Sequence, residues 1–311
     1  MKSERKPLLA LTASLVMPGL GQVYNGELTK GLSIFLMFAF MMPIFSYIAL
    51  HAPTSILWVV ILLGAIFALV IYVVSVRDAY LSAIRIGGGY QLAAYNKAYA
   101  YMAILFFGYF FVLNQLTDYT KTWFVEAFKV PSESMLPNLL RGDHFFVDKR
   151  VNYPGAKSTL QRGDASIFVY PNNRTTIYIK RIIGLPGDKI EIKDTEVLVN
   201  GKSIRGEEIH NLGNAELNQL LETHLAYKEA GDQGQYIVLW KKDTKHDSST
   251  FTVPNGHVFV LGDNRDQSQD SRQFGSVPMT DVTAKAIQVW LSIDSDIGIR
   301  WNRFGKIVKV N

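Results

Sequence analysis

The sequence contains no cysteine among its 311 residues. This absence excludes disulfide bonds, a thiol nucleophile and metal sites built on cysteine, and it leaves the redox compartment undecided. The chain also lacks a long run of basic residues, because the lysines and arginines behind its net charge of +5 are scattered along it. This pattern argues against nucleic acid as a partner. It favours membrane topology and a basic surface that faces anionic lipid.

Charged residues are missing altogether from Gly31 to Val76, where His51 to Ser55 form the one polar interruption. The pattern predicts two membrane-spanning helices, over residues 31–50 and 56–76, each near the roughly 20 residues that a bilayer requires. A third uncharged run, over residues 98–116, predicts a third span. We therefore expect a multi-span α-helical membrane domain over residues 1–117.

Residues 7–24 are uncharged too, but Pro18, Gly19 and Gly21 interrupt them. They are ambiguous between a span and an interfacial or re-entrant element. Basic residues flank them and also fill the loop between the second and third predicted spans: Lys2, Arg5, Lys6, Lys30, Arg77, Arg85 and Lys97. The positive-inside rule places these cations in the cytoplasm and everything after Leu116 outside it. That assignment requires residues 7–24 not to span; four spans with an external N-terminus are the alternative.

The stretch Pro18-Gly-Leu-Gly-Gln-Val-Tyr-Asn-Gly26, followed by Lys30-Gly31 and a hydrophobic hairpin, resembles the TM2-type membrane module. An alternative interpretation is local. Glycine and proline then end one helix, and Asn25-Gly26 forms a turn.

Residues 118–311 have a different sequence pattern, with short runs in which apolar residues alternate, such as Thr176 to Ile183 and His257 to Leu261. These runs are typical of β-strands. The pair Gly-Asp recurs at 142, 163, 187 and 262, where glycine can adopt a positive φ and aspartate can bond its own backbone. We expect a mostly antiparallel β domain. Its alternation weakens over residues 201–252, which we interpret as a smaller inserted subdomain with a helical patch at 215–224.

A stiff loop, Pro131-Ser-Glu-Ser-Met-Leu-Pro137, follows soon after the last predicted span. The prolines at its ends restrict its backbone, and a serine nucleophile needs such a fixed setting. An ordinary surface loop is the alternative.

Lys180 lies within the predicted strand Thr176 to Ile183, where the period of two places it on one face with Tyr178 and Ile182. If this face is buried, desolvation lowers the lysine pKa and the amine can act as a base. A shift from about 10.4 to about 7.5 corresponds to roughly 4 kcal/mol. Alternatively, the side chain extends to solvent from an edge strand.

A third segment, Gly262-Asp-Asn-Arg-Asp-Gln-Ser-Gln-Asp-Ser-Arg272, leaves directly from an apolar strand. A rigid sheet commonly holds functional polar loops in this way. A solvated charged loop and a calcium loop are alternatives, although Arg265 and the carboxylate spacing do not match an EF-hand.

Together these segments resemble signal peptidase I, the leader peptidase family of Ser/Lys proteases, over nearly all of residues 118–311. The matching blocks are Pro131 to Pro137, Arg162 to Asp164, Tyr178 to Asp188 and Gly262 to Gly275. The resemblance implies that Ser134 is the nucleophile and Lys180 the general base. It implies oxyanion donors from the Ser132 hydroxyl and the Ser134 backbone N–H. It further implies that Ser268 orients Lys180 and that Asp270 and Arg272 form a supporting ion pair. Asn138 departs from the family, which has threonine there.

The resemblance also implies removal of N-terminal signal peptides from exported preproteins by a serine endopeptidase, without metal or organic cofactor. We expect a multi-pass protein of the bacterial cytoplasmic membrane with its catalytic domain on the periplasmic or extracytoplasmic face. Signal peptides and the lipid bilayer are its expected partners, with the secretion translocon as a further candidate and nucleic acid excluded. The rival functions are a Ser/Lys protease that matures one exported protein, and a catalytically silent membrane scaffold.

Overall fold

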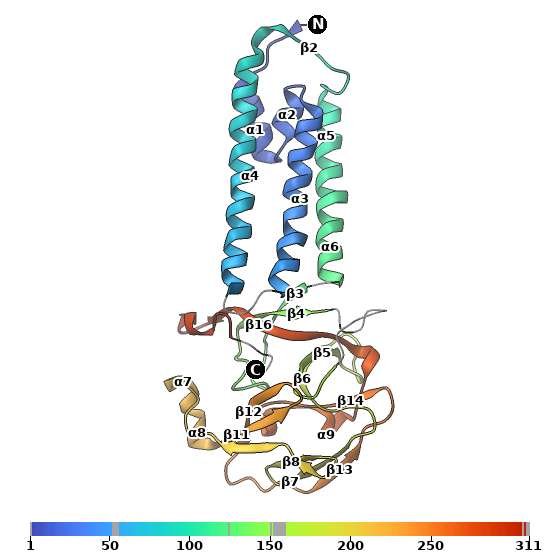
Figure 1. The fold of residues 1–311 in the computed structure, drawn as a ribbon, viewed down its shortest axis with the longest axis vertical. Coiled ribbons are helices and arrows are strands. Elements are labelled where there is room, and N and C mark those ends of the chain that lie inside the picture. The colour runs from blue at the N-terminus through green and yellow to red at the C-terminus, as the bar shows by residue number, and fades with distance from the viewer. Residues whose placement is uncertain are drawn as a thin grey trace. The chain divides into compact units, whose positions relative to one another are not determined.

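The computed structural model describes residues 2–51, 56–123, 125–149, 151, 160–306 and 308. The chain divides into two compact units, Met1–Phe124 and Val125–Asn311. The first is helical and the second is built mainly of antiparallel strands (Figure 1). The predicted fold class is confirmed to this extent: apolar helices at the N-terminus precede a mostly antiparallel β domain.

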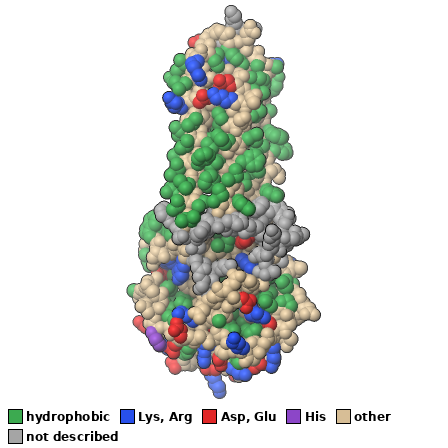
Figure 2. Space-filling view, viewed as in Figure 1, with side chains coloured by type: hydrophobic (Ala, Val, Ile, Leu, Met, Phe, Trp, Pro, Cys, Tyr) green, Lys and Arg blue, Asp and Glu red, His purple; other side chains and the backbone are tan. Residues whose placement is uncertain are grey.

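The helical unit contains three long apolar elements and a shorter N-terminal pair. The pair is α1 (Pro7–Val16) and α2 (Leu20–Tyr24), and the long elements are α3 (Leu28–His51), α4 (Leu57–Ile86) and the continuous run α5 (Ala98–Phe106), η3 (Phe107–Leu113) and α6 (Asn114–Trp123). A short ladder pairs β1 (Lys2–Ser3) with β2 (Tyr90–Gln91), which follows η2 (Gly87–Gly89). Hydrophobic side chains cover the long helices, and charged ones gather at one end (Figure 2).

Within the described part of the chain, three helices are long and apolar enough to cross a membrane: Leu28–Ile48, Val59–Gly89 and Ala98–Thr122. The first begins at Leu28 rather than at 31, and the other two end well past the predicted bounds. We placed the second end at 76 and the third at 116, because we ended each span where charges or polar residues begin. A helix can continue through polar residues beyond its apolar surface, so α4 ends at Ile86 and α6 ends at Trp123. Residues 52–55 of the predicted turn lie outside the described residues.

The segment over residues 7–24 is a helical hairpin, and α1 is too short at 10 residues to span a bilayer. Helix α2 packs closely against its neighbours: a Cβ on Gly21 would lie 2.1 Å from the Ala10 carbonyl oxygen. Buried polar side chains then tie α2 to α4, since Gln22 donates to the Ser75 carbonyl at 2.8 Å and Asn25 donates to the Ala79 carbonyl at 2.7 Å. The helix end at Val16 and the turn at Asn25-Gly26 agree with the local interpretation, which does not explain the contacts with α4; the TM2-type resemblance stays a prediction.

The β unit has a central sheet in the order β15-β14-β6-β5-β16-β4-β3, with β17 paired to β16. Its strands are β3 (Val125–Lys129), β4 (Asp143–Asp148), β5 (Ala165–Val169), β6 (Ile177–Gly184), β14 (His257–Leu261), β15 (Val277–Pro278), β16 (Val282–Asp294) and β17 (Gly298–Ile299). A four-stranded sheet adds β7 (Lys189–Lys193), β8 (Glu196–Val199), β9 (Lys202–Ser203) and β13 (Ser249–Thr252). Short helical turns complete the unit: η4 (Arg265–Gln267), α9 (Ser271–Phe274), η5 (Met279–Asp281) and η6 (Trp301–Arg303).

Residues 201–252 hold more strand than the sequence pattern predicted. A three-stranded sheet joins β10 (Arg205–Glu208), β11 (His224–Gly231) and β12 (Gly234–Lys241), and the helical patch splits into α7 (Ala215–Asn218) and α8 (Leu220–Thr223). The apolar run Tyr236 to Trp240 in β12 was the missed signal. The boundary between the two units also lies at Phe124, beyond the predicted 117.

Three of the four Gly-Asp pairs are turns of one kind. Gly142, Gly163 and Gly187 have positive φ. In each, the aspartate carboxylate accepts the backbone N–H three residues earlier, from Leu140, Gln161 or Leu185, at 2.7–2.9 Å. Gly262 differs, because its φ is not positive and its aspartate binds Arg181 instead. The fourth pair therefore belongs to a side-chain cluster rather than to a repeated turn.

Candidate active site

Apolar residues within and just after the loop Pro131 to Pro137 hold it in place by packing into two different hydrophobic clusters. Met135 and Leu139 are fully buried in the core of the large sheet, with Phe145 and Val289. Leu136 and Leu140 pack into a separate cluster formed with residues of the 201–252 segment, including Leu217 and Leu239. Two independent cores thus hold the loop that carries Ser134.

Ser134 and Lys180 meet inside the β unit, although 46 residues separate them. Lys180 Nζ donates to Ser134 Oγ at 2.8 Å, and the two residues are 5% and 6% exposed. Ser132 Oγ lies 3.3 Å from Ser134 Oγ. In the described residues the Ser134 backbone N–H has no hydrogen-bond acceptor. The alternative of Lys180 extending to solvent is therefore wrong.

Burial controls the protonation of Lys180. Its face of β6 packs with Tyr178 and Ile182, as the period of two predicted, and the next residue, Arg181, is also fully buried. Desolvation lowers the pKa of Lys180 to about 8, while the negative charges of Asp270 and Asp263 oppose this shift. About half of the amine is consequently neutral at pH 8.

The loop after β14 comes against the nucleophile loop through Gly262. A Cβ at this position would lie 2.2 Å from Ser268 Oγ and 2.6 Å from the Ser134 carbonyl oxygen, so only glycine leaves room for both. Asn264 N–H then donates to the Ser134 carbonyl at 3.1 Å. The fourth glycine of the Gly-Asp series is required by this close approach.

Ser268 is near the dyad, but its hydroxyl does not reach Lys180. Lys180 Nζ makes its second bond to the Ile179 carbonyl oxygen, at 3.1 Å. Among the described residues, the buried Ser268 Oγ has no hydrogen-bond partner. The orienting role that the resemblance implies for Ser268 thus stays a prediction, and the hydroxyl is free to bind a further group.

Asp270 and Arg272 form the expected ion pair, with Arg272 Nε 2.8 Å from Asp270 Oδ1. The other carboxylate oxygen of Asp270 accepts the Gly262 backbone N–H at 3.0 Å. Asp270 also caps α9, where Gln273 completes a capping box. The pair therefore fixes the loop at both of its ends.

The carboxylates of this loop point to separate partners rather than toward a common centre. Asp263 binds Arg181 and Asp266 binds His246, whereas Asp270 binds Arg272. The described residues hold no group of three or more carboxylate and histidine side chains arranged for a metal ion. The calcium-loop alternative has no support in this arrangement.

A family model for signal peptidase, peptidase S26, matches residues 102–291. The chain belongs to this family. As a member, it is a serine endopeptidase of the signal peptidase type. The predicted resemblance to signal peptidase I is confirmed.

Curated relatives named "Signal peptidase I" agree with this assignment. One from Buchnera aphidicola (subsp. Baizongia pistaciae) is 31% identical over 65% of this chain and 82% of its own length. One from Pseudomonas fluorescens is 34% identical over 55% of this chain and 66% of its own length. One from Rickettsia conorii is 36% identical over 56% of this chain and 76% of its own length. A crystal structure of a signal peptidase I from Enterococcus faecalis matches 41% of this chain and 97% of that chain at 30% identity, with a TM-score of 0.29.

Sequence reasoning missed two buried ion pairs that support the signal peptidase site. Arg181 binds Asp263 through Nε and Nη2 at 2.7 and 2.6 Å, and both side chains are at most 1% exposed. Asn138, the residue that departs from the family pattern, donates to the same carboxylate at 2.7 Å and to the Ile237 carbonyl at 2.7 Å. Asn138 therefore bonds the nucleophile loop to Asp263.

The second pair joins the 201–252 segment to the same loop. Glu229 in β11 binds Arg265, and both side chains are at most 1% exposed. Arg265 Nε also donates to the Gly262 carbonyl at 3.0 Å, and its guanidinium lies 5.3 Å from the Trp240 ring. The sequence pattern predicted only a smaller inserted subdomain over residues 201–252. Its strands instead hold the loop that carries Ser268.

We expect Glu229→Gln to destabilise the β unit by about 3–5 kcal/mol, because Arg265 would remain buried without its counter-charge. Glu207→Gln is the matched control: its ion pair with Lys228 is exposed, so its loss should have little effect. Thermal unfolding of both variants in detergent measures the difference. Equal unfolding temperatures for the two variants would contradict a structural role for the buried pair.

Proposed function

We propose that this chain removes N-terminal signal peptides from exported preproteins, with Ser134 as the nucleophile and Lys180 as the general base. The observation that carries the assignment is the 2.8 Å hydrogen bond from a buried amine to a serine hydroxyl in a member of the signal peptidase family. Neutral Lys180 takes the Ser134 proton as the hydroxyl oxygen attacks the scissile carbonyl. The resulting ammonium then protonates the leaving amine. Water releases the acyl group from Ser134.

The oxyanion of the tetrahedral intermediate is held by the Ser132 hydroxyl and the Ser134 backbone N–H. The position of Ser132 Oγ, 3.3 Å from Ser134 Oγ, supports this role, as does the unfilled backbone donor. Each such donor contributes about 3 kcal/mol to transition-state stabilisation. Asp270 and Arg272 keep the neighbouring loop in place, and Ser268 contributes a hydroxyl beside the dyad.

The three long apolar helices cross the bacterial cytoplasmic membrane in this proposal, and the β unit lies on the extracytoplasmic face. Charge placement supports the orientation, since Lys30, Arg77, Arg85 and Lys97 lie at the ends that face the cytoplasm. Exposed apolar side chains on the β unit, including Ile297 at 65% and Trp301 at 72%, suit contact with lipid. Signal peptides are the substrate, and the translocon is a candidate partner.

Replacement of either member of the dyad tests the chemistry. Ser134→Ala and Lys180→Ala should each lower preprotein processing by at least about a thousandfold, because the two groups act as a unit. The measurement is cleavage of several unrelated preproteins by the purified, folded enzyme in detergent, with sequencing of the new N-termini. Full activity in either variant would refute the dyad. Cleavage of one preprotein alone would favour the specialised protease.

The pH dependence follows from the protonation of Lys180. Its neutral form is the base, so kcat/KM should rise about tenfold per pH unit on the acid side and level off above the pKa of about 8. Asp270 raises this pKa, so Asp270→Asn should move the rising limb to lower pH. Asp247→Asn, at an exposed position, is the control and should leave the limb in place. A limb that moves upward in Asp270→Asn would contradict the assignment.

Reporter fusions test the orientation. A reporter that is active only outside the cytoplasm should be active when fused after Asn311 and inactive when inserted after Ala94, in the loop between the second and third spans. Because the two fusions test opposite faces of the membrane in the same protein, each serves as a control for the other. An inactive reporter after Asn311 would overturn the proposed topology.

A further inference from the structure

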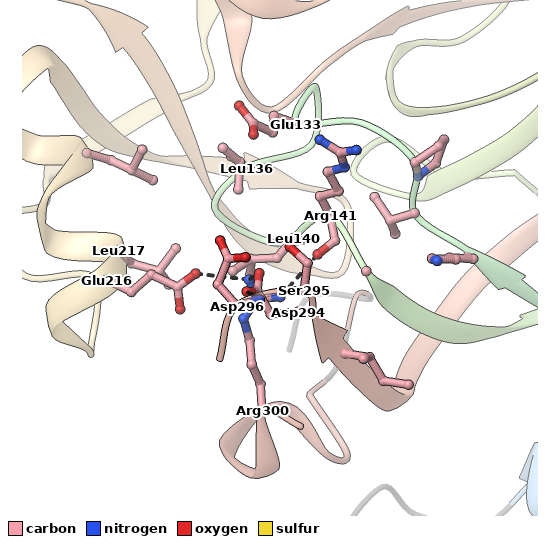
Figure 3. Close-up of a pocket in the computed structure, with 16 residues that line it drawn as sticks. Glu133, Leu136, Leu140, Arg141, Glu216, Leu217, Asp294, Ser295, Asp296 and Arg300 are labelled. Atoms are coloured by element: carbon pink, nitrogen blue, oxygen red, sulfur yellow. Dashed lines mark hydrogen bonds and ion pairs between the residues drawn. The ribbon is translucent and has the colours of Figure 1, made fainter. Parts of the chain in front are cut away.

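A cavity of about 780 Å³ lies beside the nucleophile loop within the β unit (Figure 3). This volume is typical of ligand pockets, which enclose roughly 300–1,000 Å³. Three parts of the unit form its walls: the nucleophile loop with Glu133, helix α7 with Glu216, and the turn after β16 with Ser295. None of the residues that line it belongs to the dyad. We call this cavity the Arg300 pocket.

Arg300 is the buried polar group of the pocket, with 9% of its surface exposed. Its Nη2 binds Glu216 at 3.1 Å and also binds Asp294, and its Nη1 donates to the Arg141 carbonyl at 3.1 Å. Its Nε is buried and has no acceptor among the described residues. These bonds hold Arg300 in the wall of the pocket, and the exposed Arg141 in the same wall can donate to a carbonyl or carboxylate oxygen of a ligand.

The remaining lining sets further requirements on the ligand. Leu136, Leu140 and Leu217 supply apolar surface. The lining has slightly more carboxylates than cations. The carboxylates are Glu133, Glu216, Asp294 and Asp296, and the cations are Lys129, Arg141 and Arg300. Glu133 and Asp296 form no ion pair in the part of the chain that the structure describes. Such a lining disfavours polyanions, and it suits a ligand with both donors and acceptors along an apolar chain.

We propose that the Arg300 pocket binds the stretch of preprotein that flanks the scissile bond. The inference rests on the proposed function. Glu133 is the residue immediately before Ser134, so its Cα lies about 3.8 Å from that of the nucleophile. A preprotein whose scissile carbonyl reaches Ser134 therefore passes the mouth of the pocket within a few residues. Its backbone carbonyls accept from Arg141, its N–H groups donate to Glu133 and Asp296, and its apolar side chains pack on the leucines.

Binding energy from substrate residues away from the reacting bond accelerates cleavage, so truncated substrates test the pocket. The substrates are peptides with one fixed cleavage site and either a short or a long flank, extended on the N-terminal side in one series and on the C-terminal side in the other. With the full-length enzyme in detergent, the long flank should raise kcat/KM about tenfold in one of the two series. The series that shows the gain identifies which flank the pocket holds.

A variant that fills the pocket separates this contribution from general damage. Ser295 lines the pocket at an exposed turn, so Ser295→Trp places a large ring there without disturbing the core. We expect it to bring the ratio of long to short kcat/KM close to one. Ser248→Trp, the same change at an exposed serine away from the pocket, should keep the wild-type ratio.

A wild-type ratio near one in both series, or an unchanged ratio in Ser295→Trp, would overturn the proposal. Both results leave the cleavage of short substrates intact, and so they leave the proposed function standing. Failure of the proposed function looks different. Then no preprotein sequence is cleaved at any length, or Ser134→Ala cleaves as fast as the wild type.

Discussion

The hydrogen bond from Lys180 Nζ to Ser134 Oγ is the interaction on which the rest of the β unit depends. It requires an amine and a hydroxyl to be buried side by side, at 5% and 6% exposure. Burial disfavours the ammonium, which is the property a general base needs near neutral pH. It also removes the water that would otherwise satisfy both groups. The surrounding strands and loops must therefore supply rigidity that compensates for this arrangement.

That rigidity comes from polar contacts at the ends of each segment and apolar contacts along them. The nucleophile loop is held by two hydrophobic clusters, and Arg303 binds the Asn138 carbonyl at 2.9 Å and the Asp143 carboxylate. The loop after β14 is held by Asp270, Arg181 and Glu229. Buried ion pairs are weak sources of net stability, since desolvation offsets their attraction. Their value here is geometric, because each one fixes a segment that contacts Ser134.

Several features could be predicted from the sequence because they are local. Uncharged runs predicted the apolar helices, and alternation predicted β6. The pairing of Ser134 with Lys180, 46 residues apart, came instead from the family resemblance. The strand period even placed Lys180 with Tyr178 and Ile182. The missed features depend on distant partners. Nothing near Glu229 indicates that Arg265 will neutralise it, and Arg181 resembles any strand arginine until β14 places Asp263 against it. The ends of the long helices were missed because hydropathy indicates where the apolar surface ends, and a helix can continue beyond that point.

The 201–252 segment shows why such distant partners matter for function. Leu217 and Leu239 pack on Leu136 and Leu140, so the segment forms one wall of the core behind the nucleophile. The Leu239 N–H donates to the Asp263 carbonyl at 2.8 Å, and Glu229 neutralises Arg265 two residues later. The same segment supplies Glu216, which together with Arg300 lines the Arg300 pocket. A part of the chain without a catalytic side chain thus contacts both loops of the site. Its sequence is constrained by their positions, because any shift of β12 would move Asp263 and with it the charge that faces Lys180.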